Sequence, residues 1–124
     1  MAKELPTHLR QGKFAEDRAL AHLQSNGLTL HRRNYRTPYG EIDLVMVDPA
    51  RHELVFVEVR YRRTDRFGGA AQSVDRQKQH KLTASAEHFR QHNEQFNHCP
   101  CRFDVVALSG GLEKGSLQWY QNAF

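Results

Sequence analysis

The sequence predicts an α/β fold in which a mixed sheet is flanked by helices, in the order αβββαββ. A hairpin pattern spans residues 40–62, where two runs rich in Val, Leu and Ile flank a polar link that contains Asp48 and Pro49. A long helical pattern separates this hairpin from a later apolar strand, and that order implies a crossover connection and a parallel strand pair. An amphipathic helical pattern precedes the first strand.

The individual elements follow from local patterns of apolar and turn-forming residues. A helix is expected over residues 9–26, ended by Gly27, and a strand over 28–33 is followed by a turn-prone stretch over 34–40. A second helix is expected from an N-cap at Ser73 to residue 93, with Val74, Leu82, Ala86 and Phe89 on its buried side. Residues 102–108 and 117–121 are predicted to be the last two strands.

Length and charge limit the classes of protein that are expected. A chain of 124 residues with 39% hydrophobic content can bury one core, which predicts a single domain over residues 1–124. The net charge of +4 and the pI near 9.3 favour phosphate-bearing partners. The N-terminus has no apolar signal region and no stretch approaches a membrane span, so we expect a cytoplasmic protein without a membrane partner.

Each strand of the predicted hairpin carries an acid in an apolar run. If the turn is centred between Ala50 and Arg51, Asp43 lies directly opposite Glu58, on the same face of the sheet. Two carboxylates about 5 Å apart repel by roughly 3 kcal/mol at an effective dielectric constant near 20, so a proton or a cation is needed between them. Arg60 follows on the same face. A register shifted by one residue would separate the two acids.

A third acid falls on the apolar face of the first helix. At 100° per residue, Glu16 lies among Ala19, Leu20 and Leu23. Burying an unpaired carboxylate is costly, so Glu16 is expected to meet a partner, to be protonated or to sit at the rim of the core. The plainer interpretation is a surface acid near Lys13.

These acids suit metal-dependent hydrolysis of nucleic acid. Divalent cations such as Mg²⁺ or Mn²⁺ take carboxylate oxygens, keep several waters and bridge to phosphate, and a neighbouring cation stabilises the charge that develops. A glycosidase is disfavoured because the chain offers little evident sugar cleft. Zinc at Cys99 and Cys101 is also disfavoured, since a structural site needs two well-spaced ligand pairs.

The sequence resembles the YraN family, which is predicted to be nuclease-like. The matching blocks are Gly12-x-x-x-Glu16-x-x-Ala19, Arg33-Asn34-Tyr35-Arg36, Gly40-Glu41-Ile42-Asp43-Leu44, Val55-Phe56-Val57-Glu58-Val59-Arg60, and Ser73-Val74 with Lys78. Asp43 followed by Glu58-Val59-Arg60 also resembles the P-D…(D/E)-x-K signature of the restriction-endonuclease-like superfamily, whose αβββαβ core is similar to that of archaeal Holliday-junction resolvases.

The resemblance implies roles for individual residues. It implies that Asp43 and Glu58 are metal ligands, that Val59 ligates through its carbonyl and that Glu16 ligates directly or through water. Asp43, Glu58, Arg60 and Glu16 would form the catalytic set. Arg60 replaces the usual lysine of the superfamily, and an arginine keeps its charge but does not give up a proton at physiological pH.

A basic and aromatic set surrounds the hairpin in sequence. Its members are Arg33, Tyr35, Arg36, Tyr39, Arg62, Arg63, Arg66, Lys78 and Lys81. Phosphate contact with some stacking is the expected role, which favours a structure-selective binder of DNA or RNA over a sequence reader. Two functions stay open: an endonuclease for structured or damaged DNA, with a homodimer as one way to cut two strands, and a binding module with little or no turnover.

Overall fold

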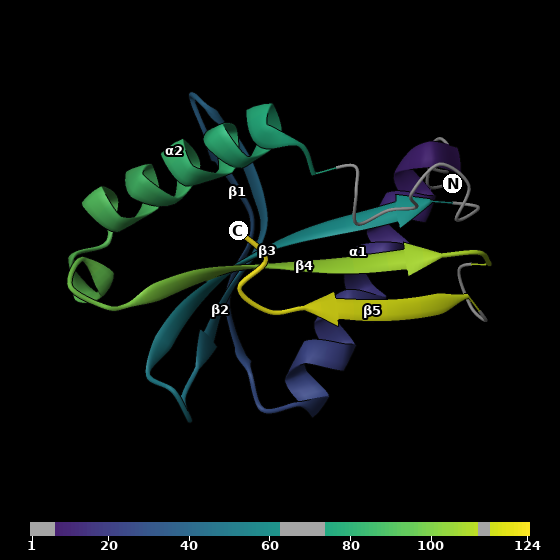
Figure 1. Cartoon of the computed structure of the whole chain (residues 1–124), viewed down its shortest axis with the longest axis horizontal. Helices are drawn as coiled ribbons and strands as arrows, with labels where there is room; N and C mark the ends of the chain where they lie inside the picture. The colour runs from purple at the N-terminus through teal and green to yellow at the C-terminus, as the bar shows by residue number, and fades with distance from the viewer. Residues whose placement is uncertain (1–6, 63–73, 112–114) are drawn as a thin grey trace, which may run out of the picture.

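The structure, a computed structural model, describes residues 7–62, 74–111 and 115–124. Its elements in chain order are α1 (Thr7–Ser25), β1 (Thr29–Thr37), β2 (Gly40–Asp48), β3 (Glu53–Arg62), α2 (Arg76–His92), the short 3₁₀ helix η3 (Glu94–Phe96), β4 (Cys101–Ser109) and β5 (Ser116–Tyr120) (Figure 1). The order αβββαββ is therefore confirmed, with η3 added between α2 and β4.

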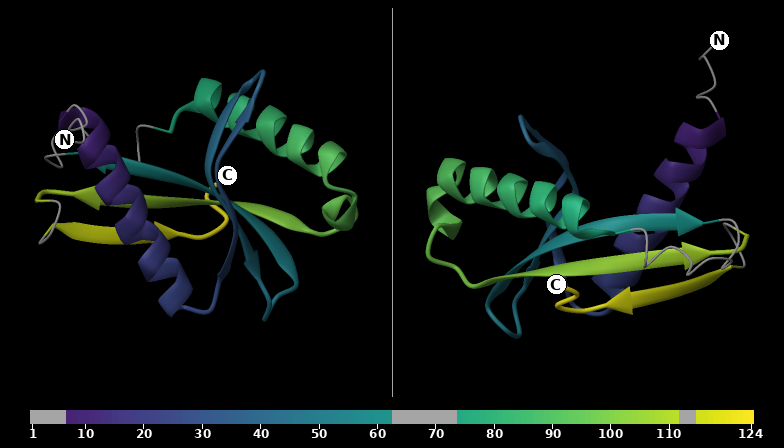
Figure 2. Two further views of the ribbon diagram at one scale, coloured as in Figure 1. Left: turned by 180° about the vertical axis from the view of Figure 1, so that it is seen from behind. Right: turned by 45° about the horizontal axis from the view of Figure 1, so that its top comes forward.

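The five strands form one mixed sheet in the order β1-β2-β3-β4-β5. Strands β3 and β4, which flank α2 in sequence, pair in parallel, and the other three pairs are antiparallel. Helix α1 lies across one face of this sheet and α2 across the other, as the views from front and back show (Figures 1 and 2). The predicted α/β class and parallel pair are confirmed.

Both helices bury the small and apolar stripe that their sequence contains. On α1 the buried stripe is Ala15, Ala19 and Leu23, which packs against β2 and β3 residues such as Leu44 and Val57. On α2 the predicted residues Leu82, Ala86 and Phe89 are buried. Burial of such side chains stabilises the fold by about 1.5–3 kcal/mol for each large one.

The start of α2 differs from the prediction. Asp75 is the N-cap, and its Oδ1 accepts a hydrogen bond of 2.9 Å from the backbone N–H of Lys78. The predicted cap, Ser73, lies outside the described residues. The later start leaves Lys78 in the first turn of the helix, on the side of the molecule where β3 ends (Figure 1).

The hairpin has the predicted register. Val47 lies opposite Leu54 and Asp48 opposite Glu53, around a turn over residues 49–52. His52 takes a positive φ of 54° in this turn. The paired residues run from Asp48 and Glu53 to Leu44 and Val57. Continued by one more residue, the same register would bring Asp43 next to Glu58.

Strand β1 is longer than predicted, because the turn-prone stretch after Arg33 is mostly strand. The turn between β1 and β2 is confined to Pro38 and Tyr39, and Thr37 Oγ1 accepts hydrogen bonds from the N–H groups of Tyr39 and Gly40 at 3.0 and 3.1 Å. Asn34, read as a turn signal, instead holds φ = 52° inside the strand.

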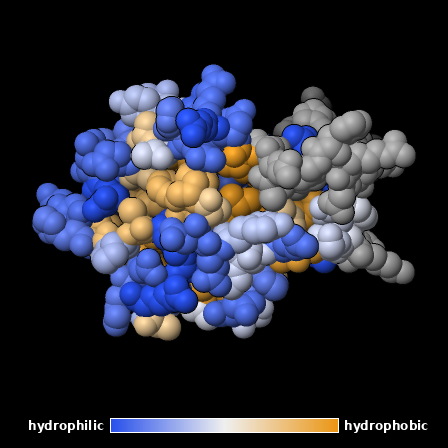
Figure 3. All heavy atoms as spheres, viewed as in Figure 1, coloured by the Kyte–Doolittle hydropathy of each residue, from blue (hydrophilic) through white to orange (hydrophobic). Residues whose placement is uncertain are grey.

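Apolar residues also reach the surface between α2 and strands β4 and β5 (Figure 3). A small cluster of Val74, Leu82 and Val105, with Phe103 and Phe124 packed against it, occupies this side. Within the described residues, neither helix combines the length and apolarity that crossing a bilayer requires.

Candidate functional site

The β2–β3 ladder ends where the acids begin. Its last ladder pair is Leu44 with Val57. Ile42 and Leu44 are two residues apart yet pack in clusters on opposite faces of the sheet, whereas a regular strand would place them on one face. Asp43 therefore sits at an irregularity in β2, opposite Asn34 with its left-handed backbone in β1.

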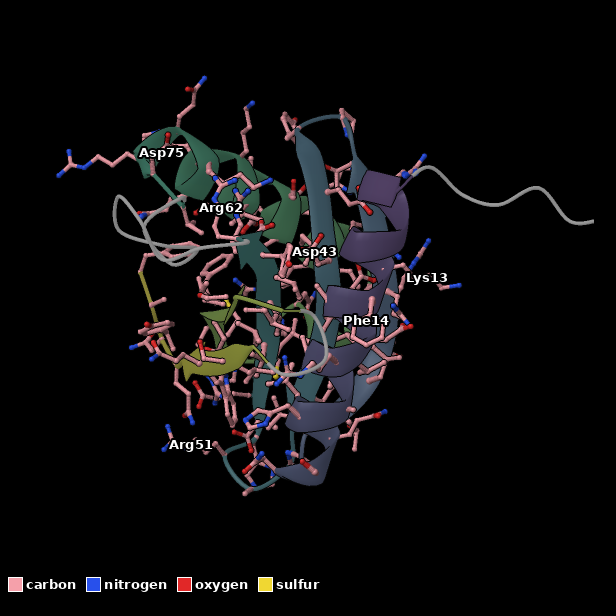
Figure 4. All side chains as sticks on the ribbon, turned by 90° about the vertical axis from the view of Figure 1, so that its right-hand side faces the viewer. Lys13, Phe14, Asp43, Arg51, Arg62 and Asp75 are labelled. Carbon is pink, nitrogen blue, oxygen red and sulfur yellow. The ribbon has the colours of Figure 1, made fainter. Side chains whose placement is uncertain are left out.

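This irregularity turns the Asp43 side chain toward β3. Its Oδ2 accepts a hydrogen bond of 2.7 Å from the backbone N–H of Val59, in place of a backbone carbonyl of β2. Figure 4 looks onto this region, with Asp43 at the centre, α1 to one side and Arg62 at the end of β3 to the other. The hydrogen bond from the Val59 N–H therefore fixes the Asp43 carboxylate to the backbone of β3, at the point where β2 and β3 separate.

The prediction that Asp43 and Glu58 project from one face needs correction. Asp43 lines a pocket on the α1 side together with Val59 and Tyr61, whereas Glu58 faces the α2 side, where it meets Lys78. The two carboxyl groups still come together, because β2 and β3 are no longer paired beyond Leu44 and Val57 and the side chains can meet between the two strands. Burial, the charge of Glu58 and contact with its carboxyl raise the pKa of Asp43 to about 8, against the opposing effect of the Val59 N–H.

Glu58 is the most enclosed acid of the site. It is 6% exposed, and two cations flank it: Lys78 Nζ lies 3.5 Å from Oε2 and Arg60 Nε lies 3.9 Å from Oε1. Among the described residues, both Glu58 Oε2 and Arg60 Nε are buried without a hydrogen-bond partner. Buried polar atoms normally have hydrogen-bond partners, so these two atoms are held here by the longer ion-pair contacts alone.

The raised pKa of Asp43 has a consequence for stability. An acid with an ordinary pKa near 3.8 that rises to about 8 on folding opposes folding, and this cost grows above about pH 4 and is complete above about pH 8. We expect Asp43→Asn to stabilise the metal-free protein at pH 9 and to have little effect at pH 4, since asparagine keeps an acceptor for Val59. Urea unfolding of both proteins with chelator present, across this pH range, measures the difference; a variant less stable than the parent at pH 9 would contradict it.

An open pocket of about 560 Å³ lies between α1 and strands β1, β2 and β3. Three acids line it, Glu16, Glu41 and Asp43, together with the basic residues Lys13, Arg33 and Arg36. Glu41 was missed at the sequence level, although it stands two residues before Asp43 and opposite Arg36 in β1. The kink at Asn34 explains the grouping, because it directs Arg33 into this pocket and Tyr35 to the other face.

Glu16 meets a partner, the first of the three outcomes left open for it. Arg33 donates to Glu16 Oε1 from Nε at 3.1 Å and from Nη2 at 3.0 Å. Arg33 Nη2 also lies 2.8 Å from Asp17 Oδ1. Burial raises the pKa of Glu16, the hydrogen bond from Arg33 lowers it and the charge of Asp43 adds to the rise, with a net upward direction.

The predicted basic and aromatic residues are placed unevenly. Arg36, Tyr39, Arg62 and Lys81 are exposed, with Tyr39 at 57%. Tyr35 is 5% exposed and its hydroxyl is hydrogen-bonded at 2.8 Å to His88 Nδ1, so its ring is part of the α2-side core and is not available for stacking. Arg63 and Arg66 lie outside the described residues.

In the described segments, no three His, Cys, Asp or Glu side chains converge in a way that could hold a metal ion. The metal set expected from the sequence was Asp43, Glu58, the Val59 carbonyl and Glu16, and of its three carboxylates Glu16 is bound to Arg33. Cys99 and Cys101 are free thiols, and Cys99 Sγ contacts the carbonyl oxygen of His52 at 3.6 Å.

These features define an α/β protein with a carboxylate-centred site at the point where two strands of a mixed sheet diverge. The chain belongs to the Uncharacterised protein family UPF0102, whose family pattern matches residues 15–108. It is 50% identical to a UPF0102 protein of Pseudomonas putida strain F1, over all of this chain and 98% of the relative. It is 47% identical to one from Pseudomonas fluorescens, over 95% of each chain, and 46% identical to one from Shewanella loihica, over 94% of this chain and 96% of the relative.

Proposed function

We propose that this protein is a divalent-metal-dependent endonuclease that hydrolyses phosphodiester bonds of structured or damaged DNA. The observation that carries the proposal is the meeting of Asp43 and Glu58 at the strand divergence, with Val59 between them on β3. Two acids forced together in a basic protein are suited to a cation with oxygen ligands.

The residues fit Mg²⁺ or Mn²⁺ on the chemistry of the donor set. Asp43, Glu58 and the Val59 carbonyl would hold the ion, and Glu58 Oε2 is a buried oxygen that no hydrogen bond from a described residue satisfies. Glu16 is the further ligand once it is released from Arg33. When bound, such a cation activates water and neutralises charge on a phosphate.

The cations around Glu58 supply the remaining electrostatics. Arg60 and Lys78 place two positive charges beside the acid pair, where they would stabilise the negative charge that develops on a phosphate oxygen. An arginine there can clamp a phosphate through two parallel N–H donors. Arg60 thus acts as a charge stabiliser in this proposal and not as a base.

The substrate is proposed from the kind of contacts available. Exposed basic residues on β1, β3 and α2 suit phosphate contacts, which position a protein on a nucleic acid and do not read its sequence. DNA with branches, nicks or lesions is the proposed substrate class, with RNA as the alternative nucleic acid. A homodimer would place two such sites on two strands.

A second candidate function is supported by Arg60 itself. Its Nε is buried without a hydrogen-bond partner in the described structure and it replaces a group that could exchange a proton. In this alternative the protein keeps the fold and the acidic site and binds nucleic acid with little or no turnover. Metal-dependent product formation separates the two functions.

The first test is cleavage of labelled branched, nicked and linear DNA, and of RNA, with Mn²⁺, Mg²⁺ or chelator. Asp43→Asn, purified alongside, excludes a contaminating nuclease, and Arg60→Lys asks whether the arginine limits turnover. We expect products with metal and the parent only, most abundant on the preferred DNA structure, and faster cleavage by Arg60→Lys.

The other outcomes are equally informative. Cleavage by Asp43→Asn at the parent's rate would refute the assignment of the site. Salt-sensitive binding by the parent with no products in any metal, and products only after Arg60→Lys, would establish the binding module instead.

A further inference from the structure

The ion pair between Glu16 and Arg33 occupies the pocket next to the proposed metal site. Arg33 lies on β1 and Glu16 on α1, and their side chains are 30% and 14% exposed. The contacts use Nε and Nη2 of Arg33, and leave Nη1 outside the pairing with the described acids. Glu16, expected to bind metal, and Arg33, expected to bind phosphate, are thus paired with each other.

We infer that Glu16 and Arg33 form an exchangeable pair: Arg33 leaves Glu16 for a backbone phosphate of the nucleic acid, and Glu16 is then free to hold the divalent cation. This inference rests on the proposed function. It assigns to Arg33 the role of positioning the nucleic acid beside the proposed metal site. The ligand class at Arg33 is the phosphodiester backbone of DNA.

The geometry of the pair favours exchange over a purely structural role. The guanidinium is part-exposed, and it also reaches Asp17, whose side chain is 52% exposed. Asp17 therefore also holds Arg33, through Nη2 at 2.8 Å, but ion pairs with an exposed partner contribute little free energy and can yield to a phosphate. A phosphate offers the guanidinium the same bidentate geometry as a carboxylate.

The exchange implies that the acid and the DNA compete for one guanidinium. Separating a half-buried pair leaves both groups uncompensated unless each gains a new partner. A phosphate on Arg33 and a cation on Glu16 provide the two partners together, so DNA and metal should each raise the affinity for the other, by the same factor.

The closing experiment works without metal, so that it does not depend on turnover. A fluorescently labelled duplex oligonucleotide is titrated with the full chain in chelator, using the parent, Glu16→Gln, Arg33→Met and the double variant. We expect Glu16→Gln to tighten DNA binding about tenfold in the parent background, because it removes one of the two acid charges that hold Arg33, and by less than about twofold beside Arg33→Met.

Glu41→Gln is the matched control. It removes one negative charge from the same pocket, and within the described residues Glu41 has no ion pair with Arg33. Any general electrostatic gain from Glu41→Gln should therefore be the same with and without Arg33→Met. An equal gain from Glu16→Gln in both backgrounds, or no gain in either, overturns the exchange.

The same proteins separate this inference from the proposed function. If Arg33 serves only to fix α1 on β1, Arg33→Met lowers the melting temperature and the coupling to DNA is absent, which refutes the exchange. If the gain in DNA affinity from Glu16→Gln depends on Arg33 but no metal supports cleavage, the exchange stands and the endonuclease is refuted. Failure of the parent to bind any DNA refutes both.

Discussion

Glu58→Gln is expected to lower the rate of metal-dependent cleavage by about 10³-fold or more. Glu58 is 6% exposed and lies beside Asp43, and its ion-pair contacts with Arg60 and Lys78 are long, at 3.9 and 3.5 Å, so its carboxylate is the proposed ligand that the substitution removes. A bound cation stabilises the transition state by several kcal/mol, and most of this stabilisation is lost when a ligand of the cation is removed. Each 1.4 kcal/mol of lost stabilisation lowers the rate about tenfold. Single-turnover cleavage with Mn²⁺ measures the loss.

DNA binding should respond in the opposite direction. Removing the carboxylate frees Arg60 and Lys78, which lie 3.9 and 3.5 Å from it, to meet phosphate. The variant should bind the labelled DNA as tightly as the parent or more tightly in chelator, which distinguishes a catalytic loss from misfolding. Glu87→Gln, on the exposed side of α2, is the control that should change neither quantity. Cleavage by Glu58→Gln within tenfold of the parent would contradict the assignment of Glu58 as a ligand.

The hairpin and its acids could be predicted because their signals are local. The turn over residues 49–52 fixes the β2–β3 register by counting, and that register brings Asp43 to Glu58. The face of Asp43 could not be predicted by counting, because regular alternation fails between Ile42 and Leu44. The only sequence signal of that failure is Asn34 in the neighbouring strand, since asparagine tolerates the left-handed backbone it adopts.

Pairings between distant elements were beyond sequence reasoning. Glu16 on the apolar side of α1 was recognised as needing a partner, but nothing local identified Arg33 on β1. Lys78 was predicted to touch nucleic acid, and its contact with Glu58 depends on how the first turn of α2 lies over β3. Such contacts depend on the crossing of packed elements, which the periodicity of either segment alone does not specify.

A buried ion network was likewise not predicted, although it joins three parts of the chain. Arg102, with a side chain 3% exposed, contacts Asp48 at 2.9 Å, Glu53 at 3.2 Å and Asp104 at 3.0 Å. Asp104 is fully buried and also accepts hydrogen bonds from the Trp119 indole and from a backbone N–H near the C-terminus, each at 2.9 Å. The network ties the β2–β3 turn to β4 and β5, far from the proposed site.

Arg102→Met is expected to lower the free energy of unfolding by about 3–5 kcal/mol. The substitution leaves the Asp104 carboxylate buried without its cation, which is the costly way to break an ion pair. That is a large part of the 5–15 kcal/mol that typically holds a domain together. Urea unfolding at pH 7 measures the loss, and Arg90→Met, which removes a pair with the exposed Glu87 and a hydrogen bond to the Asn97 carbonyl, should cost less than about 2 kcal/mol.

The pH dependence of this loss identifies its cause. Burial alone would raise the pKa of Asp48, but hydrogen bonds from Arg102 and from the Arg51 N–H hold it below its ordinary value near 3.8. A carboxylate with a lowered pKa stabilises the fold above its unfolded pKa and loses that effect as pH falls through the folded pKa. The difference in free energy of unfolding between the parent and Arg102→Met should therefore narrow as pH falls and be smallest below about pH 4. A gap that stays constant down to pH 3 would assign the loss to packing of the Arg102 stem and not to its charge.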